Sequence, residues 1–95
     1  MRLVRVRGDS MSPSYRDGDY VLTLRYGRRQ PRVGDDVVYS HPDRGLLLKR
    51  VDHLDDTGLT VSGLNTLSAD SASLGPVATA RFPELNRVVF HFPRA

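Results

Sequence analysis

One lysine, Lys49, stands against thirteen arginines in this chain of 95 residues. The two cations differ chemically, because arginine stays charged at ordinary pH whereas a buried lysine amine can lose its proton. Lys49 lies in the apolar run 46–51, which is suited to desolvating an amine, and Ser10 lies in a turn-like setting between Gly8 and Pro13. A serine hydroxyl is a poor nucleophile until a base takes its proton. The two residues together indicate a serine nucleophile with a lysine base, although a genomic bias toward arginine would give the same count.

The residues around Ser10 also have structural explanations. Gly8 permits a backbone conformation that other residues resist, and such a turn could aim the Ser10 amide N–H at a developing oxyanion. Asp9 is adjacent in sequence and should point away from the serine, so we interpret it as a turn former. We expect Met11 to pack beside the site. Ser10 itself could simply cap a single helical turn over residues 10–16.

Composition indicates one small domain over residues 1–95. The net charge of +3 is spread along the chain without a block of like charges, so no nucleic-acid partner is expected. Cysteine is absent and the three histidines lack metal-ligand spacing, so we expect no metal and no cofactor. No apolar stretch approaches the ~18–20 residues needed to span a bilayer. We therefore expect a cytoplasmic protein without a membrane span.

Hydrophobic alternation with a period of two dominates the chain, and this pattern is typical of β-strands. Turn-forming residues separate the alternating runs at 17–18, 31–34, 42–45, 56–58 and 75–76. No amphipathic helix of ten or more residues is visible. The sequence therefore predicts an all-β fold, a single compact domain of antiparallel sheets, with strands over residues 2–7, 20–25, 37–39, 46–51 and 88–92.

Three ordered motifs resemble those of a known peptidase superfamily. Residues 8–13, followed by 17–19, resemble the nucleophile motif of type I signal peptidases, and residues 48–51 resemble their lysine motif. Residues 62–77 resemble their third motif, and 33–35 resemble the approach to the second strand. The resemblance implies a coiled β fold, shared with the catalytic domain of LexA-type self-cleaving repressors, and a serine endopeptidase activity.

Carried over by this resemblance, Ser10 is the nucleophile, Lys49 is the general base, and Ser68 orients the lysine amine. The amide of Ser10 would hold the oxyanion. Taken alone, Ser68 could equally be ordinary turn chemistry.

The third motif departs from the family pattern at two positions. Leu64 stands where the family has an acid, and Ala72 stands where it has an arginine. Asp70 thereby loses its usual partner, and we expect it to pair with Arg50 or another arginine. Asp70 could instead cap or pair on the surface. These departures leave open a catalytically impaired peptide-binding module of the same fold.

Nine residues precede Ser10 in the sequence, which is too few to supply a membrane anchor or a cleavable segment of the same chain. We therefore expect cleavage of another protein, with removal of an N-terminal leader or pro-segment. Residues 41–42, 45–47 and 49–51 resemble the small nickel-type superoxide dismutase maturation proteases, which makes a nickel superoxide dismutase precursor the candidate substrate. The self-cleaving domain of a larger repressor-like chain is the remaining alternative.

Overall fold

The computed structural model describes residues 1–64 and 75–94, and this part of the chain is built mostly of β-strands. In chain order the elements are β1 (Arg2–Arg5), β2 (Tyr20–Arg25), β3 (Asp36–His41), β4 (Gly45–Leu54), β5 (Gly58–Ser62), β6 (Val77–Ala78), the 3-10 helix η1 (Thr79–Glu84) and β7 (Asn86–Phe92). The five strands that the alternation predicts are confirmed. The strand β5, the short β6 and the helix η1 are not among the predicted elements.

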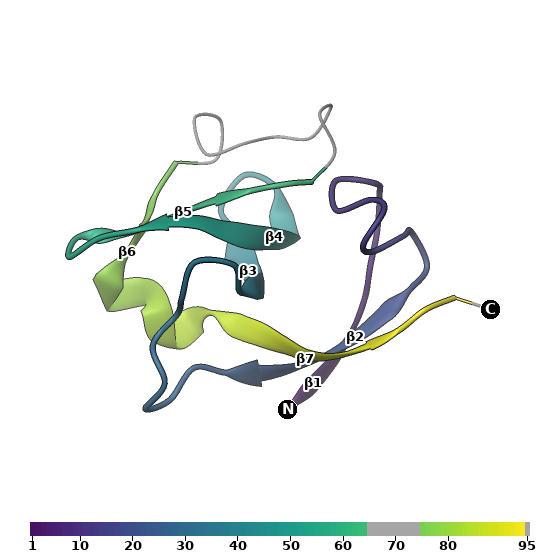
Figure 1. Ribbon diagram of the computed structural model, residues 1–95, viewed down its shortest axis with the longest axis horizontal. Coiled ribbons are helices and arrows are strands. Elements are labelled where there is room, and N and C mark those ends of the chain that lie inside the picture. The colour runs from purple at the N-terminus through teal and green to yellow at the C-terminus, as the bar shows by residue number, and fades with distance from the viewer. Residues whose placement is uncertain (65–74, 95) are drawn as a thin grey trace.

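One antiparallel sheet contains these strands in the order β1-β2-β7-β3-β4-β5-β6. The junction between β7 and β3 is short, because it pairs only Val37 with Arg87 and Val38 with Asn86. It divides the sheet into a part made of β1, β2 and β7 and a part made of β3 to β6, which fold over one another in Figure 1. The predicted all-β domain of coiled antiparallel sheet is therefore confirmed.

Two apolar clusters pack on opposite faces of β3. Because successive strand residues face opposite ways, β3 contributes Val37 and Tyr39 to one cluster and Val38 to the other. Burying each such side chain stabilises the fold by roughly 1.5–3 kcal/mol. The larger cluster contains Tyr26, Val37, Tyr39, Val51, Leu59, Val61, Val77, Phe82 and Leu85. The smaller cluster contains Val6, Met11, Tyr15, Val21 and Val38, with Val4, Leu48, Leu64 and Val88 packed against it.

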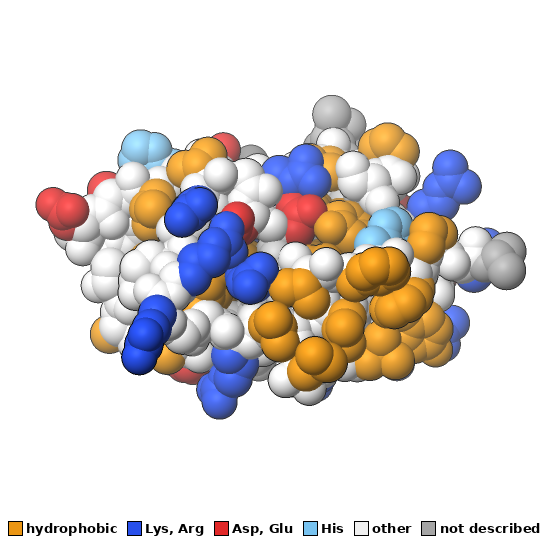
Figure 2. Space-filling model, turned by 60° about the horizontal axis from the view of Figure 1, so that its bottom comes forward, with side chains coloured by type: hydrophobic (Ala, Val, Ile, Leu, Met, Phe, Trp, Pro, Cys, Tyr) orange, Lys and Arg blue, Asp and Glu red, His pale blue; other side chains and the backbone are white. Residues whose placement is uncertain are grey.

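One face of β1, β2 and β7 remains exposed and apolar. The strand registers set Leu3 beside Leu22 and Leu22 beside Phe90. Tyr20 pairs with Phe92 on the same face, and the rings of Phe90 and Phe92 have centroids 4.7 Å apart. Figure 2 shows apolar side chains gathered over this side of the molecule. The opposite face of these strands packs on the smaller cluster.

The 3-10 helix η1 has six residues and Pro83 within it. In the part of the chain that the structure describes, no helix is both long enough and apolar enough to cross a membrane.

Candidate active site

Ser10 lies in a loop of residues 7–18 that is closed at its base by backbone and side-chain hydrogen bonds. The Val6 N–H donates to the Asp19 carbonyl at 2.7 Å, and the Gly18 N–H donates to the Val6 carbonyl at 2.9 Å. One step further in, the Gly8 N–H donates to Oδ1 of Asp17 at 2.8 Å. These bonds fix both ends of the segment that carries the serine, which we call the Ser10 loop.

Tight turns shape the inside of the Ser10 loop. Gly8 has a φ of +80°, a conformation that side chains disfavour, so the predicted unusual backbone conformation is confirmed. The Ser12 N–H donates to the Asp9 carbonyl at 3.0 Å, which fits the interpretation of Asp9 as a turn former. The Tyr15 N–H donates to the Met11 carbonyl at 2.9 Å, giving the expected single helical turn. Met11 is buried in the smaller cluster, as predicted for a packing residue.

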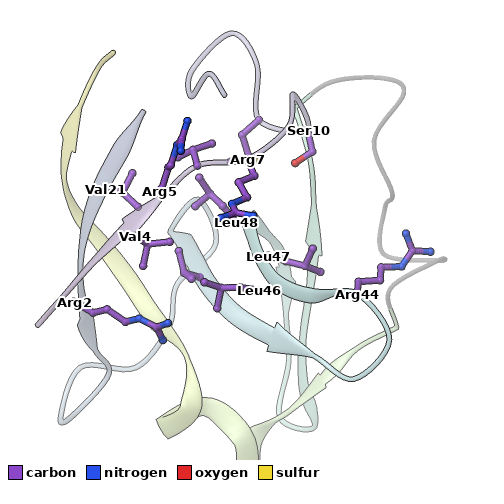
Figure 3. Close-up of a pocket in the computed structure, with 13 residues that line it drawn as sticks. Arg2, Val4, Arg5, Arg7, Ser10, Val21, Arg44, Leu46, Leu47 and Leu48 are labelled. Carbon is purple, nitrogen blue, oxygen red and sulfur yellow. The ribbon is translucent and has the colours of Figure 1, made fainter. Parts of the chain in front are cut away.

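Ser10 opens onto a pocket of about 480 Å³ between β1 and the first half of β4 (Figure 3). Among the residues that the structure describes, neither the Ser10 hydroxyl nor its amide N–H has a hydrogen-bond partner. Within this part of the chain, neither group is therefore engaged in another contact. The other lining residues are Arg2, Val4, Arg5, Val6, Arg7, Met11, Val21, Val38, Arg44, Leu46, Leu47 and Leu48.

Lys49 follows these leucines on β4 and is only 3% exposed. It pairs with Val37 of β3, and its neighbours on the same strand face, Leu47 and Val51, belong to or pack on the larger cluster. Burial, and to a smaller degree the positive charge of Arg44, lower the pKa of the Lys49 amine below its ordinary value. Both effects disfavour the ammonium form. The expected desolvation of this lysine is therefore present.

The segment after β5 connects the Ser10 loop to the strand that carries Lys49. The Leu64 N–H donates to the Ser10 carbonyl at 2.7 Å. β5 pairs with β4 through Ser62 opposite Arg50, and continuing that register by one and two places would set Gly63 opposite Lys49 and Leu64 opposite Leu48. Leu48 and Leu64 do pack against the same cluster, as residues opposite one another should. The contact therefore ties the backbone of Ser10 to the segment that follows β5, whose last pair with β4 joins Ser62 to Arg50, the residue after Lys49.

A second connection between the Ser10 loop and β4 runs through Asp36. Tyr15 of the loop donates its hydroxyl to Oδ2 of Asp36 at 2.7 Å. Arg50, the residue after Lys49, donates to both carboxylate oxygens of Asp36, from Nε at 2.6 Å and from a terminal nitrogen at 3.1 Å. Bidentate pairs of this kind fix orientation as well as adding energy. The Tyr15–Asp36–Arg50 bridge therefore holds the Ser10 loop against β4.

Asp19 anchors the far side of the Ser10 loop to the C-terminal strand. Its carboxylate accepts the Arg16 N–H at 2.9 Å, the Arg94 N–H at 2.7 Å and a contact from Nε2 of His91 at 2.7 Å. These hydrogen bonds, the backbone ones first, lower the pKa of Asp19 to about 2. The Asp19 carboxylate therefore has a structural role, as does the Asp17 carboxylate that accepts the Gly8 N–H.

The structure does not describe most of the residues singled out in the third motif. Ser68, Asp70 and Ala72 lie outside the described residues, and so does the expected pairing of Asp70 with Arg50. Leu64, which stands where an acid was expected from the resemblance, packs half-buried against the smaller cluster. An acid at that position would face apolar side chains.

Tyr15 and Asp36 are site residues that the sequence interpretation did not identify. The signal for Asp36 is the hairpin formed by β3 and β4, whose register pairs Asp36 with Arg50 and His41 with Gly45. Counting back from the turn at 42–45 would have placed an acid opposite the arginine that follows Lys49. Tyr15 carries no comparable signal, because its contact with Asp36 depends on how the Ser10 loop folds.

Within residues 1–64 and 75–94, no group of three or more histidine, aspartate or glutamate side chains is placed to hold a metal ion.

Comparison with known proteins gives one match. The family model described as Peptidase S24-like matches residues 1–73, which include the Ser10 loop, the strand of Lys49 and the connection through Leu64. No curated protein matches the chain, and no solved structure does. Because the matched region covers more than half of the sequence, the chain belongs to the Peptidase S24-like family.

Proposed function

We propose that this protein is a serine endopeptidase in which Ser10 is the nucleophile and Lys49 the general base. Family membership supports a serine peptidase in general terms. The observation that carries the specific assignment is the burial of the only lysine on β4, directly after the leucines that share a pocket with Ser10. A depressed pKa gives this amine a neutral fraction that an exposed lysine lacks at neutral pH.

The proposed reaction follows the ordinary course of acyl transfer. The neutral amine of Lys49 takes the hydroxyl proton of Ser10 while Oγ attacks the scissile carbonyl, and the Ser10 N–H donates to the resulting oxyanion. The ammonium then returns its proton to the leaving amine. Water, deprotonated by the same lysine, hydrolyses the acyl-enzyme and restores the serine. Ser68 remains a proposed orienting partner for the lysine, and Gly8, Asp9, Met11, Arg50 and Asp70 remain proposed supporting residues.

The proposed substrate is an extended segment of another protein. Within residues 1–64 and 75–94, β1 is an edge strand that pairs only with β2, and the pocket lies beside it. Peptides commonly bind by adding a strand to such an edge. Removal of an N-terminal leader by a single domain of residues 1–95 fits this arrangement, and the resemblance to nickel-type superoxide dismutase maturation proteases makes such a precursor the first candidate. The cytoplasmic location stays a prediction.

A second candidate is a peptide-binding module that has lost its activity. Leu64 favours it, because a leucine packed in an apolar cluster cannot supply the charge expected at that position. The two candidates share the pocket and differ only in turnover.

Turnover of candidate precursor peptides by wild type, Ser10→Ala and Lys49→Arg separates these candidates. Products are identified by mass spectrometry, and circular dichroism verifies that each variant is folded. Lys49→Arg keeps a cation and removes the base, so we expect no turnover with either variant. In wild type, kcat/KM should rise with pH as the Lys49 amine loses its proton. Full activity of Lys49→Arg would exclude the lysine as base, and binding without cleavage by wild type would favour the inactive module.

A further inference from the structure

The pocket at Ser10 is strongly cationic for its size. Four of its thirteen lining residues are arginines, Arg2, Arg5, Arg7 and Arg44, and no lining residue is an acid. In Figure 3 the side chains of Arg2 and Arg7 extend toward the pocket from its two ends, and Arg44 stands on the opposite side beyond Leu47. Arg5 points away from Leu46 and Leu48, on the face of β1 that also carries Leu3, so the positive charge lies on both faces of this strand beside the pocket.

Three of these arginines lack an internal counter-ion. Arg2, Arg5 and Arg7 are exposed, and within the described part of the chain none of them forms an ion pair with a carboxylate. Arg29 and Arg50, by contrast, pair with Asp35 and Asp36. Arg2, Arg5 and Arg7 are therefore available to meet charge on a ligand.

The rest of the wall is apolar. Val4 lies across the pocket from Leu46 and Leu48, whereas Leu47 lies on the opposite face of β4 (Figure 3). An extended peptide turns successive side chains to opposite sides and advances about 3.3 Å per residue. A segment lying along β1 would therefore set alternate side chains against this apolar wall, where Arg7 also extends, and the others on the face of β1 that carries Arg5.

We propose that the Ser10 pocket selects extended peptide segments in which acidic residues alternate with apolar ones next to the scissile bond. The inference rests on the proposed function, which places the scissile bond of the substrate at Ser10. It adds a substrate class to that function. Arg5 and Arg7 determine the specificity through their guanidinium groups, which pair with substrate carboxylates. Each partly exposed pair of this type is worth about a two- to fivefold change in binding.

Synthetic ten-residue peptides with an alanine-rich centre test the proposal in three matched forms, in which the alternate flanking residues are glutamate, glutamine or lysine. Binding is measured by fluorescence anisotropy with Ser10→Ala, and cleavage is measured with wild type. We expect the order glutamate, glutamine, lysine in both assays. The preference should disappear in 1 M salt, where the screening length is about 3 Å.

Arg5→Gln and Arg7→Gln should each reduce the preference for the glutamate peptide over the glutamine peptide about two- to fivefold. Arg28→Gln is the matched control, because Arg28 is exposed and does not line the pocket. Equal binding of all three peptides by Ser10→Ala, or a preference unchanged in both pocket variants, would overturn the inference. Selective binding by Ser10→Ala without cleavage by wild type would support the substrate class and refute the peptidase. Cleavage without charge preference would do the reverse.

Discussion

Replacing Lys49 with methionine tests whether burial of the Lys49 amine destabilises the folded state. Lys49→Met keeps an unbranched chain of similar length and removes the charge from a position that is 3% exposed. Each unit by which burial lowers the pKa of the amine destabilises the folded state by about 1.4 kcal/mol when the lysine is protonated in both states. The lowered pKa therefore makes the variant more stable than wild type at neutral pH, in proportion to the shift.

The pH dependence gives the sign of the effect. Between the lowered pKa of the folded state and the ordinary lysine value, the unfolded chain binds more protons, so the stability of wild type rises with pH across this window. Lys49→Met lacks that rise. The excess stability of the variant should be greatest below the folded-state pKa and should shrink as the pH approaches about 10.

Urea unfolding followed by far-ultraviolet circular dichroism between pH 6 and 10 measures this difference. Leu48→Met is the matched control, because it alters the adjacent residue of β4 without changing charge. Its difference from wild type should not vary with pH. Parallel stability profiles for wild type and Lys49→Met would show that the amine pays no desolvation cost, and the lysine would then be unsuited to act as a base at neutral pH.

Three further predictions concern the residues that hold the serine loop. Tyr15→Phe removes the hydrogen bond to Asp36, and it should lower the free energy of unfolding by about 1 kcal/mol and reduce turnover, whereas Tyr20→Phe on the exposed face should change neither. Asp19→Asn should flatten the acid side of the stability profile. The reason is that the contribution of Asp19 to stability is complete above its ordinary pKa of about 4 and is lost as the pH falls to about 2. Thermal unfolding between pH 2 and 5 measures this change, and an unchanged profile would contradict the prediction. Gly8→Ala should cost about 1 kcal/mol through its positive φ, since an added Cβ meets no atom of the described residues within 4 Å. Gly27→Ala, which has equal space and no positive φ, should cost nothing in the same thermal assay.

The sequence predicts those strands in which many apolar residues alternate, and it misses those in which few do. β2 and β7 carry several such residues each, whereas β5 offers only Leu59 and Val61 between Gly58 and Ser62. Both of these side chains are nonetheless fully buried, because pairing with β4 carries them into the larger cluster. A strand of five residues with two apolar positions is fixed by its partners rather than by its own pattern.

The candidate site shows the same division between local and long-range information. The burial of Lys49 was predictable, since its apolar neighbours are adjacent in sequence and β alternation assigns them to faces. The positive φ of Gly8 was also a local property. The Tyr15–Asp36–Arg50 bridge was not predictable in this way, because it joins a loop, β3 and β4 across 35 residues of chain and depends on the register of a hairpin.

That register also explains how an acid and a desolvated lysine can lie one residue apart. Asp36 stands opposite Arg50, while the next pair of the ladder sets Val37 opposite Lys49. Alternation turns the two pairs to opposite faces of the hairpin, and the Asp36 charge is matched by a guanidinium that holds both of its oxygens. A one-residue slip would bring the carboxylate to the lysine, stabilise the ammonium and remove the base. The pairing of Asp36 with Arg50 therefore ties the serine loop to β4 and keeps the nearest negative charge in the ladder away from the amine.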